Sequence, residues 1–467
     1  MLTRERVVRR QMLIKTGKPF DSASAAETAR NLRRLGIFRD VSVDTITTDS
    51  GLIARVVTRD SWTTEVYTSL KSGGNQTAWG LGIVERNFLG SQTSVTGRYI
   101  RDADRSTTQI GIGLPAVWRK RLGVIATVSH LSDGERSRLI VAAPFTSLSI
   151  RESFGFDVQY EDASLQRFVD GRPAAPGTLR HLLAQATTTV GRATYASPTG
   201  FVRLGIALRV RREDFDPASR SDANRSVFGD AELSVEASRA HFAVAYGFRN
   251  LAGPEDIDLS ATVRVGMWVT PSAWGYERGG IGPTLALHAG RAFPNGFATA
   301  DVRASSRITP GGLDSGTVTA ASVLMWQPVL RHSVVVGTFG GLEHRARPDD
   351  EFDLGLTFGP RGFPLHAFTG NRAFFTTAEY RWVAVPELAG LAAMALATFV
   401  DYGGAWYSGS PVRAGADAGA GIRFGSTRSS SGKGATRIDV ARRFADGVFP
   451  AEWVVAVGTG LPFDRRH

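Results

Sequence analysis

Apolar and polar residues alternate with a period of two from Trp62 to the C-terminal end of the chain. Within 62–71, Trp62, Val66 and Leu70 are expected on one face, with polar residues such as Glu65 on the other. Similar segments follow at 92–102, 105–115, 119–132, 134–145, 148–161, 180–192, 199–212, 227–237, 239–249, 255–268, 281–293, 296–308, 315–330, 332–344, 371–384, 393–406, 414–426, 435–444 and 452–463. One face carries Val, Leu, Ile and aromatic residues and the other carries Gly, Ser, Thr and Arg, which favours strands with lipid on one side and water on the other.

The chain contains no run of about 18 or more uninterrupted apolar residues, so a transmembrane helix is not expected. The nearest candidate, 388–400, is too short and follows Pro386 and Glu387. Strands therefore have to cross the membrane, and a closed barrel is the only sheet that satisfies all its backbone groups in lipid. We expect a mainly β protein in which a transmembrane antiparallel β-barrel occupies residues 61–467.

The first 60 residues have a different pattern, which predicts a small α+β domain. A short amphipathic helix is expected over 3–13 and a second helix over 22–35, in which Ser24 and Glu27 have capping-box spacing. Two strands are expected to follow, at about 40–47 and 51–58.

Composition and motifs exclude several functions. The chain has no Cys, which excludes disulfides and thiolate metal sites. The net charge of +11 comes from Arg residues scattered singly through alternating segments, so we expect no nucleic-acid partner. The eight His residues show no metal-ligand spacing, and no nucleophile or phosphate-binding motif is present. We therefore expect no enzymatic activity, no cofactor and no metal.

One loop, 345–370, interrupts the strand pattern and contains the most unusual segment of the chain. Residues 359–370 combine Gly and Pro with apolar bulk, which predicts a loop that folds back and docks. Strand parity then directs Glu379 and Asp401 into the lumen, and we expect Arg361 to meet both carboxylates there.

Three motifs in this region resemble the BamA/TamA superfamily of outer-membrane assembly factors. Pro360-Arg361-Gly362-Phe363 resembles the V-R-G-F/Y loop signature of that superfamily, with Pro in place of Val. Ala378-Glu379-Tyr380-Arg381 resembles the acidic strand that follows this loop, and Phe399-Val400-Asp401-Tyr402-Gly403 resembles the next strand, of pattern F-x-D-x-G. The resemblance implies a membrane barrel with an inserted luminal loop.

The N-terminal segment resembles a POTRA domain, through Lys18-Pro19-Phe20 and the run from Leu35 to Val41. A POTRA domain begins with a strand before its first helix, and this chain starts after that position. The resemblance therefore implies a partial POTRA-like domain over 1–60 and an incomplete N-terminus.

The number of strands is left open by the two arguments. The resemblance implies about sixteen, whereas the alternating segments number near twenty. Sixteen is favoured here, with an enlarged barrel as the alternative, and the disagreement lies between residues 134 and 345. Two polar stretches, 162–179 and 213–226, are expected to be long connections.

The last segment resembles the signal by which outer-membrane barrels are recognised for insertion. This resemblance rests on Gly458, Leu461 and Phe463 in the pattern G-x-x-L-x-F. Leu461 and Phe463 are expected to face lipid, and Gly458 and Gly460 to face the lumen. Because Gly458 and Gly460 pack nothing, the seam between the first and last strands is expected to be weak.

The resemblance implies an outer-membrane factor that inserts or translocates proteins through this seam. The alternatives are a passive channel and a secretion pore or surface antigen that serves one partner. The implied partners are outer-membrane lipid, unfolded β-barrel clients or a secreted protein, and periplasmic chaperones or accessory lipoproteins. The implied location is the bacterial outer membrane, with the N-terminal domain in the periplasm.

Overall fold

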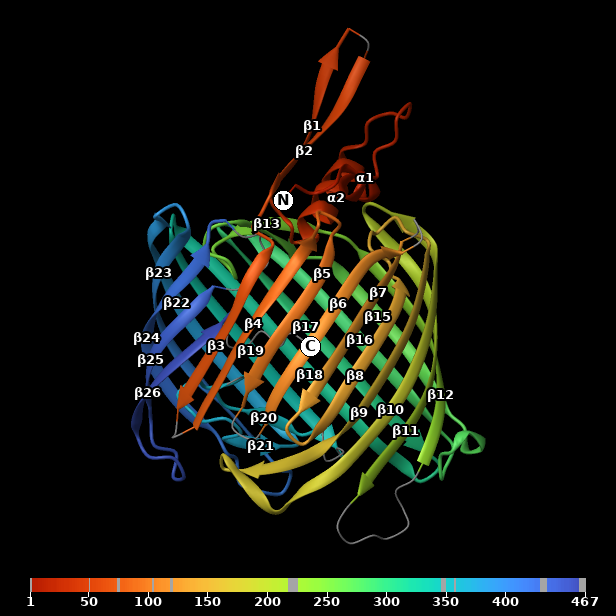
Figure 1. Ribbon diagram of the computed structural model, residues 1–467. Coiled ribbons are helices and arrows are strands. Elements are labelled where there is room, and N and C mark those ends of the chain that lie inside the picture. The colour runs from red at the N-terminus through yellow and green to blue at the C-terminus, as the bar shows by residue number, and fades with distance from the viewer. Residues whose placement is uncertain are drawn as a thin grey trace.

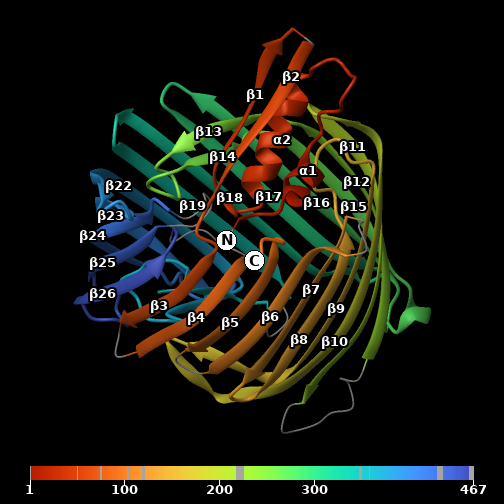
Figure 2. The ribbon, with the colours of Figure 1, turned by 45° about the horizontal axis from the view of Figure 1, so that its top comes forward.

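A computed structural model describes residues 2–49, 51–73, 76–102, 105–117, 121–216, 226–345, 350–356, 358–428 and 435–461. The described chain forms a large antiparallel barrel with a small N-terminal region of helices and strands at one end (Figure 1). Seen from that end, the N-terminal region lies across the mouth of the barrel (Figure 2).

The wall contains twenty strands among the described residues, and each strand pairs with antiparallel neighbours. The first ten are β3 (Thr64–Gly73), β4 (Gln76–Phe88), β5 (Thr93–Arg101), β6 (Ser106–Val117), β7 (Leu122–Leu131), β8 (Gly134–Ala143), β9 (Glu152–Val169), β10 (Arg172–Ser197), β11 (Gly200–Asp216) and β12 (Ser226–Arg239). The others are β15 (Ala261–Thr270), β16 (Gly280–Phe293), β17 (Gly296–Thr309), β18 (Gly312–Val329), β19 (His332–His344), β22 (Arg372–Leu388), β23 (Ala392–Trp406), β24 (Gly415–Ser426), β25 (Thr436–Arg443) and β26 (Glu452–Thr459). A 3-10 helix, η2 (Ser272–Trp274), lies between β15 and β16.

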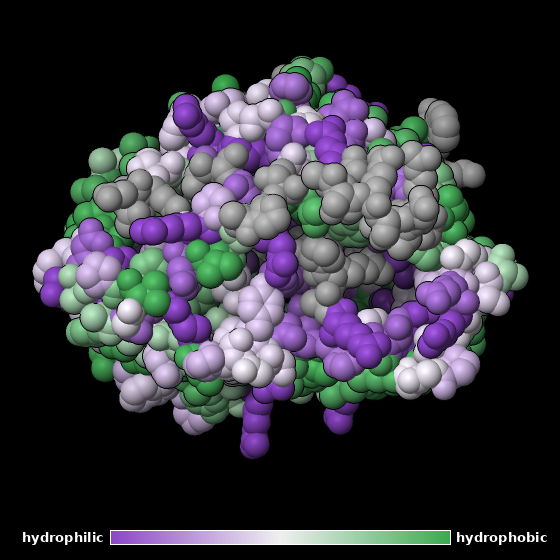
Figure 3. Space-filling view, turned by 90° about the horizontal axis from the view of Figure 1, so that it is seen from below, coloured by the Kyte–Doolittle hydropathy of each residue, from purple (hydrophilic) through white to green (hydrophobic). Residues whose placement is uncertain are grey.

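The period of two places apolar side chains on the outside of the wall. Val66, Ile83, Ile110 and Val128 are all more than half exposed on this outer face, although they are large and apolar. Viewed from the end opposite the N-terminal region, hydrophobic residues gather along the sides and hydrophilic residues surround the mouth (Figure 3). The outside therefore offers a surface suited to lipid.

The favoured count of sixteen strands is wrong, and the enlarged barrel is the one that forms. The reason is that nearly all the alternating segments between residues 134 and 345 pair as hairpins of the wall. The polar stretch 162–179 is not the long connection that we expected, since β9 and β10 continue through it to a turn at Asp170 and Gly171. In the second stretch, β11 extends to Asp216, and residues 217–225 lie outside the described part of the chain. The segment 239–249 does leave the wall: it contributes β13 (Phe242–Tyr246), which pairs with β14 (Pro254–Asp258).

The N-terminal region contains α1 (Glu5–Gln11), α2 (Ser22–Arg34) and the hairpin of β1 (Phe38–Thr48) and β2 (Gly51–Asp60), close to the expected positions. Its core contains Val7, Leu32, Ile37 and Phe38. The capping-box prediction is wrong: Asp21 is the N-cap of α2, and it accepts hydrogen bonds from the backbone N–H groups of Ala23 and Ser24.

Glu27, the other residue of the expected capping box, instead connects α2 to the barrel. It accepts hydrogen bonds from Ser147, Leu148 N and Ser149 in the turn between β8 and β9. Among the described residues, no helix is both long enough and apolar enough to cross a membrane.

The ring is completed at a seam between β26 and β3, and this seam is almost unpaired. Ala456 and Lys71 form its only residue pair among the described residues. By contrast, β26 pairs with β25 from Glu452 to Thr459, along its whole length. The two edges therefore share one residue pair, and the rest of the ring is continuously paired.

Candidate functional site

The loop between β19 and β22 folds into the barrel from the end opposite the N-terminal region. Its two short strands, β20 (Phe352–Leu354) and β21 (Phe368–Gly370), pair with each other. The loop buries a set of aromatic rings against the inner wall, namely Phe352, Phe358, Phe363 and Phe368 from the loop with Phe339 and Phe375 from the wall. Phe358 meets both wall rings edge-on, at centroid distances of 5.1 Å and 5.8 Å. This packing holds the loop in one position.

Arg361 lies at the inner end of this loop and is completely buried. Its Nε donates to Asp401 Oδ2 at 2.7 Å, and its Nη1 donates to Glu379 Oε2 at 3.0 Å. A third carboxylate, Asp439, lies 3.3 Å from Nη1, and the guanidinium carbon stands 3.7 Å from the centroid of the Phe399 ring. The fork of the guanidinium matches this site in a way that a Lys ammonium would not.

The two carboxylates predicted from the sequence belong to a larger buried cluster of charges. Arg423 donates to Glu379 Oε2 at 2.7 Å and also binds Asp439. Arg437 donates to Asp439 Oδ2 at 2.8 Å. The cluster contains Arg361, Arg381, Arg423 and Arg437 together with Glu379, Asp401, Asp417 and Asp439. Four guanidinium side chains thus meet four carboxyl side chains in this cluster.

The neighbours of Arg361 in the loop are fixed by close contacts with the wall. Gly362 N donates to Asp417 Oδ2 at 2.9 Å, and a Cβ on Gly362 would lie 2.8 Å from the Asp417 Cβ. A Cβ on Gly403 would lie 2.6 Å from the Phe374 carbonyl oxygen. Both positions therefore require glycine for lack of space. The Phe363 ring fills the space over a third glycine, Gly415, where a Cβ would approach it to 2.1 Å.

Two leucines of the same loop reach the seam from the inside. Leu356 and Leu365 form a buried apolar cluster with Ala78 of β4 and Ala456 of β26. Ala78 is paired with Lys71 of β3, so the cluster touches both sides of the seam. The loop therefore bridges the two wall edges that share a single residue pair.

The predicted seam residues lie in different environments. Gly458 is buried, as its expected inward parity requires, and Trp453 and Val455 are exposed on the outer face. The prediction for Leu461 is wrong, because β26 ends at Thr459 and Gly460 adopts a φ of +75°. Leu461 then turns into the lumen, where it is buried with Phe248 and Val335. Phe463 lies outside the described residues.

Sequence reasoning did not identify Asp439, Arg423, Asp417 or Arg437. Strand parity could have identified them in the two strands that follow Asp401. Asp417 and Arg423 share a face of β24, and Arg437 and Asp439 share a face of β25. Strand parity places Arg381 on the same face as Glu379, but no partner was predicted for it. In the structure it donates from Nε to Glu379 Oε1 at 2.6 Å.

No family model matches the sequence, and no curated protein matches it. Among solved structures, CdiB from Escherichia coli is similar to this chain, with a TM-score of 0.51 at 12% sequence identity over 97% of this chain and 74% of that one. In fold, the chain is similar to CdiB. The barrel fold that the motifs implied is therefore confirmed.

Two further structures match at lower TM-scores. CdiB from Acinetobacter baumannii is 11% identical, with a TM-score of 0.46 over 97% of this chain and 71% of that chain. BamA from Haemophilus ducreyi lacking POTRA domains 1–3 is 13% identical, with a TM-score of 0.43 over 98% of this chain and 82% of that chain.

Proposed function

We propose that this chain is an outer-membrane protein of the BamA/TamA type, which inserts or translocates other proteins through its seam. The observation that carries this proposal is the single residue pair between β3 and β26. The neighbouring ladders are far more extensive: β3 pairs with β4 from Thr64 to Gly73, and β26 pairs with β25 along its length.

The edge of β3 that faces β26 supplies the chemistry for this function. In the described part of β26, Ala456 is the residue that pairs with β3, through Lys71. An exposed strand edge presents unpaired N–H and C=O groups to any extended chain nearby. A client strand can add to this edge through main-chain hydrogen bonds, which read little of the client sequence. An unfolded β-barrel or a secreted β-rich protein fits this requirement.

The buried charge cluster supports the proposal by making one side of the seam rigid. It joins the Arg361 loop to β22, β23, β24 and β25, the four wall strands that precede β26. The Leu356 and Leu365 cluster then connects the loop to the seam itself. Opening at the seam therefore moves β3 and β26 against a fixed internal support.

The apolar outer face and the N-terminal region complete the proposal. Exposed residues such as Ile83, Ile110 and Leu233 on the outside of the wall suit the outer membrane. We assign residues 1–60 to a partial POTRA-like domain in the periplasm, and residues 61–467 to the barrel with the inserted loop 345–370. Chaperones or accessory lipoproteins would meet the protein at the periplasmic domain.

A passive channel is the second candidate, favoured by the charged lining of the other half of the lumen. Arg136 pairs with Glu161 at 2.6 Å, and the Arg136 side chain stays 49% exposed. Such half-exposed ion pairs are typical of a water-filled interior. Single-channel conductance in a planar bilayer measures this activity directly.

A disulfide across the seam tests the proposed function, because the chain contains no Cys. Leu70→Cys and Val457→Cys place two thiols opposite each other across the seam, one position beyond the Lys71–Ala456 pair in the antiparallel register. Leu70→Cys with Trp79→Cys is the matched control, since these residues are paired in the ordinary β3–β4 ladder.

We expect the oxidised seam variant to lose insertion of an unfolded outer-membrane barrel into lipid vesicles, and to regain it on reduction. The control variant should insert the client at the same rate in both states. Equal insertion by the oxidised and reduced seam variants would overturn the proposal. In the cell, depletion separates general loss of outer-membrane barrels from loss of one secreted partner.

A further inference from the structure

A hairpin between two wall strands lies inside the end of the barrel that carries the N-terminal region (Figure 2). Residues 240–260, which we call the insert, connect β12 to β15 and contain β13 and β14. Among the described residues these two strands pair only with each other. The insert is therefore an element in its own right, with one end at the mouth and its tip in the lumen.

At the mouth, the insert is attached to α2 of the N-terminal region. Arg33 forms a bidentate pair with Asp256 of β14, with N···O distances of 2.6 Å and 2.7 Å. The guanidinium carbon of Arg30 stands 4.3 Å from the centroid of the Phe242 ring of β13. Both strands of the hairpin are thus held by one face of the same helix.

In the lumen, the insert packs against the wall and against Leu461, which follows β26. The Phe248 ring meets the Phe297 ring of β17 edge-on, with the centroids 5.1 Å apart. Phe248 and Ile257 belong to one buried cluster with Val335 of β19 and with Leu461. The insert therefore supplies part of the apolar site that keeps Leu461 turned inward.

Main-chain hydrogen bonds connect the insert tip to the seam through one residue. Ala435 N donates to Arg249 O of the tip at 2.8 Å. Ala435 O accepts from Gly460 N, at the point where β26 has left the wall, at 3.0 Å. The tip also touches the charge cluster, because Arg381 donates to Phe248 O.

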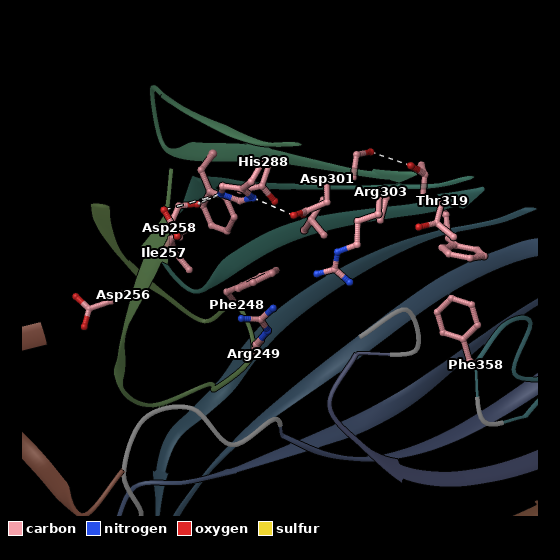
Figure 4. Close-up of a pocket in the computed structure, with 17 residues that line it drawn as sticks. Phe248, Arg249, Asp256, Ile257, Asp258, His288, Asp301, Arg303, Thr319 and Phe358 are labelled. Carbon is pink, nitrogen blue, oxygen red and sulfur yellow. Dashed lines mark hydrogen bonds and ion pairs between the residues drawn. The ribbon is translucent and has the colours of Figure 1, made fainter. Parts of the chain in front are cut away.

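One side of the insert faces open space. A cavity of about 490 Å³ lies beside the insert and is lined by Phe248, Arg249 and Asp258 of the insert and by Asp301 and Arg303 of β17 (Figure 4). Arg303 is exposed within the lumen, and its side chain points into this cavity (Figure 4). The insert therefore has space beside it to shift sideways, once the Phe248–Phe297 contact and the hydrogen bond between Asp258 O and His288 Nε2 are broken.

We propose that the insert couples the N-terminal region to the seam. While α2 holds Asp256 and Phe242, the insert keeps Leu461 and Gly460 turned inward, and the end of β26 stays away from β3. When α2 leaves, the insert moves towards the cavity and releases this end, which then extends along β3. A partner that binds the N-terminal region thus changes the seam without touching it.

The rate of disulfide trapping across the seam tests this proposal in the full-length protein. The reporter is the Leu70→Cys/Val457→Cys pair under a mild oxidant, in detergent micelles. Arg33→Glu breaks the contact with Asp256, and we expect trapping to become faster, on the order of tenfold. The charge swap Arg33→Glu/Asp256→Arg should restore the parent rate, because it rebuilds the ion pair.

Two controls make the result specific. Arg55→Glu breaks a bidentate pair of the same geometry with Asp44, in the β1–β2 hairpin away from the insert, and should leave the trapping rate unchanged. Replacement of the insert tip, 247–253, by a short Gly-Ser linker should speed trapping as much as Arg33→Glu does. In that background Arg33→Glu should add nothing, because both changes act on one element.

Two results would overturn the coupling. One is a trapping rate in Arg33→Glu equal to that of the parent. The other is a further acceleration by Arg33→Glu in the variant whose tip has already been replaced. Heat-modifiable migration on gels checks that each variant retains a folded barrel. The assay uses no client protein, so its failure leaves the proposed function standing. Loss of client insertion with intact coupling would instead count against the proposed function alone.

Discussion

Arg361 and Asp401 are joined by two hydrogen bonds between completely buried side chains, from Nε to Oδ2 at 2.7 Å and from Nη2 to Oδ1 at 3.2 Å. The backbone N–H of Arg361 also donates to Asp401 Oδ2, at 3.2 Å. Asp401 therefore fixes both the side chain and the main chain of the loop. This pair joins a loop that enters from one end of the barrel to a strand of its wall.

Removing the Arg361 guanidinium leaves Asp401, Glu379 and Asp439 without their shared cation. We expect Arg361→Ala to lower the free energy of unfolding by about 3–5 kcal/mol, as found when one member of a buried charge group is removed. Urea unfolding followed by tryptophan fluorescence measures the change. Arg372→Ala is the matched control, because Arg372 is exposed and binds only Ser408 among the described residues. Equal losses in the two variants would contradict the assigned role of the cluster.

Gly415 tests whether the loop depends on its aromatic packing as well as on charge. A Cβ at this position would lie 2.1 Å from the Phe363 ring, so Gly415→Ala has to displace that ring. We expect a loss of about 1–3 kcal/mol, which is typical of overpacking. Gly340→Ala is the control, because a Cβ there meets nothing within 4 Å. Faster proteolysis within the loop should accompany the loss only in Gly415→Ala.

The inward faces of the strands could be predicted from the sequence, because parity alone decides which side chains meet in a barrel lumen. Glu379 and Asp401 lie on the same inner face of neighbouring strands, through the Glu379–Phe399 and Thr377–Asp401 pairs. The same rule extended to β24 and β25 would have added Arg423 and Asp439.

The insert and the turn at Leu461 could not be predicted in this way. Residues 242–246 alternate as a wall strand does, because a hairpin inside a barrel also has one packed and one wet face. Leu461 continues the outward parity of Val455 and Val457, and only the positive φ of Gly460 reverses its direction. Such a backbone change depends on long-range contacts with Ala435 and Phe248, which local sequence does not encode.

Glu255 should make the insert sensitive to pH. Its carboxylate accepts from the backbone N–H groups of Arg249 and Asn250, both at 2.8 Å, and this shapes the tip. Burial raises the pKa of Glu255 above its ordinary value, although those hydrogen bonds and the charges of Arg249 and Arg381 oppose the rise. A carboxyl whose pKa is higher in the folded protein binds its proton more tightly there than in the unfolded chain.

The insert should therefore dock more firmly as the pH falls through the raised pKa of Glu255, and this gain should level off below the ordinary pKa. Limited proteolysis of the insert from about pH 8 to about pH 5 measures the effect. Glu255→Gln retains a side-chain oxygen that can accept from the N–H groups of Arg249 and Asn250, but it cannot titrate, so it should abolish the pH dependence. Glu277→Gln, at an exposed position, should preserve it. A pH dependence that survives in Glu255→Gln would assign the effect to another group.

Leu365 should hold the two edges of the seam together from inside the barrel. It is buried with Leu356 against Ala78 and Ala456, on opposite sides of the seam. Leu365→Ala should lower the free energy of unfolding by about 2–5 kcal/mol, the range for a buried leucine. In the background of the two seam cysteine substitutions described above, it should also slow disulfide trapping, because the edges lose their common support and separate.

Leu342→Ala is the control for this variant, because it truncates a leucine that is 55% exposed on the outer face. It should change neither the free energy of unfolding nor the trapping rate, since its side chain contributes little buried area. Faster trapping in Leu365→Ala would mean that the loop keeps the two edges apart, which is the opposite of the role assigned to it here.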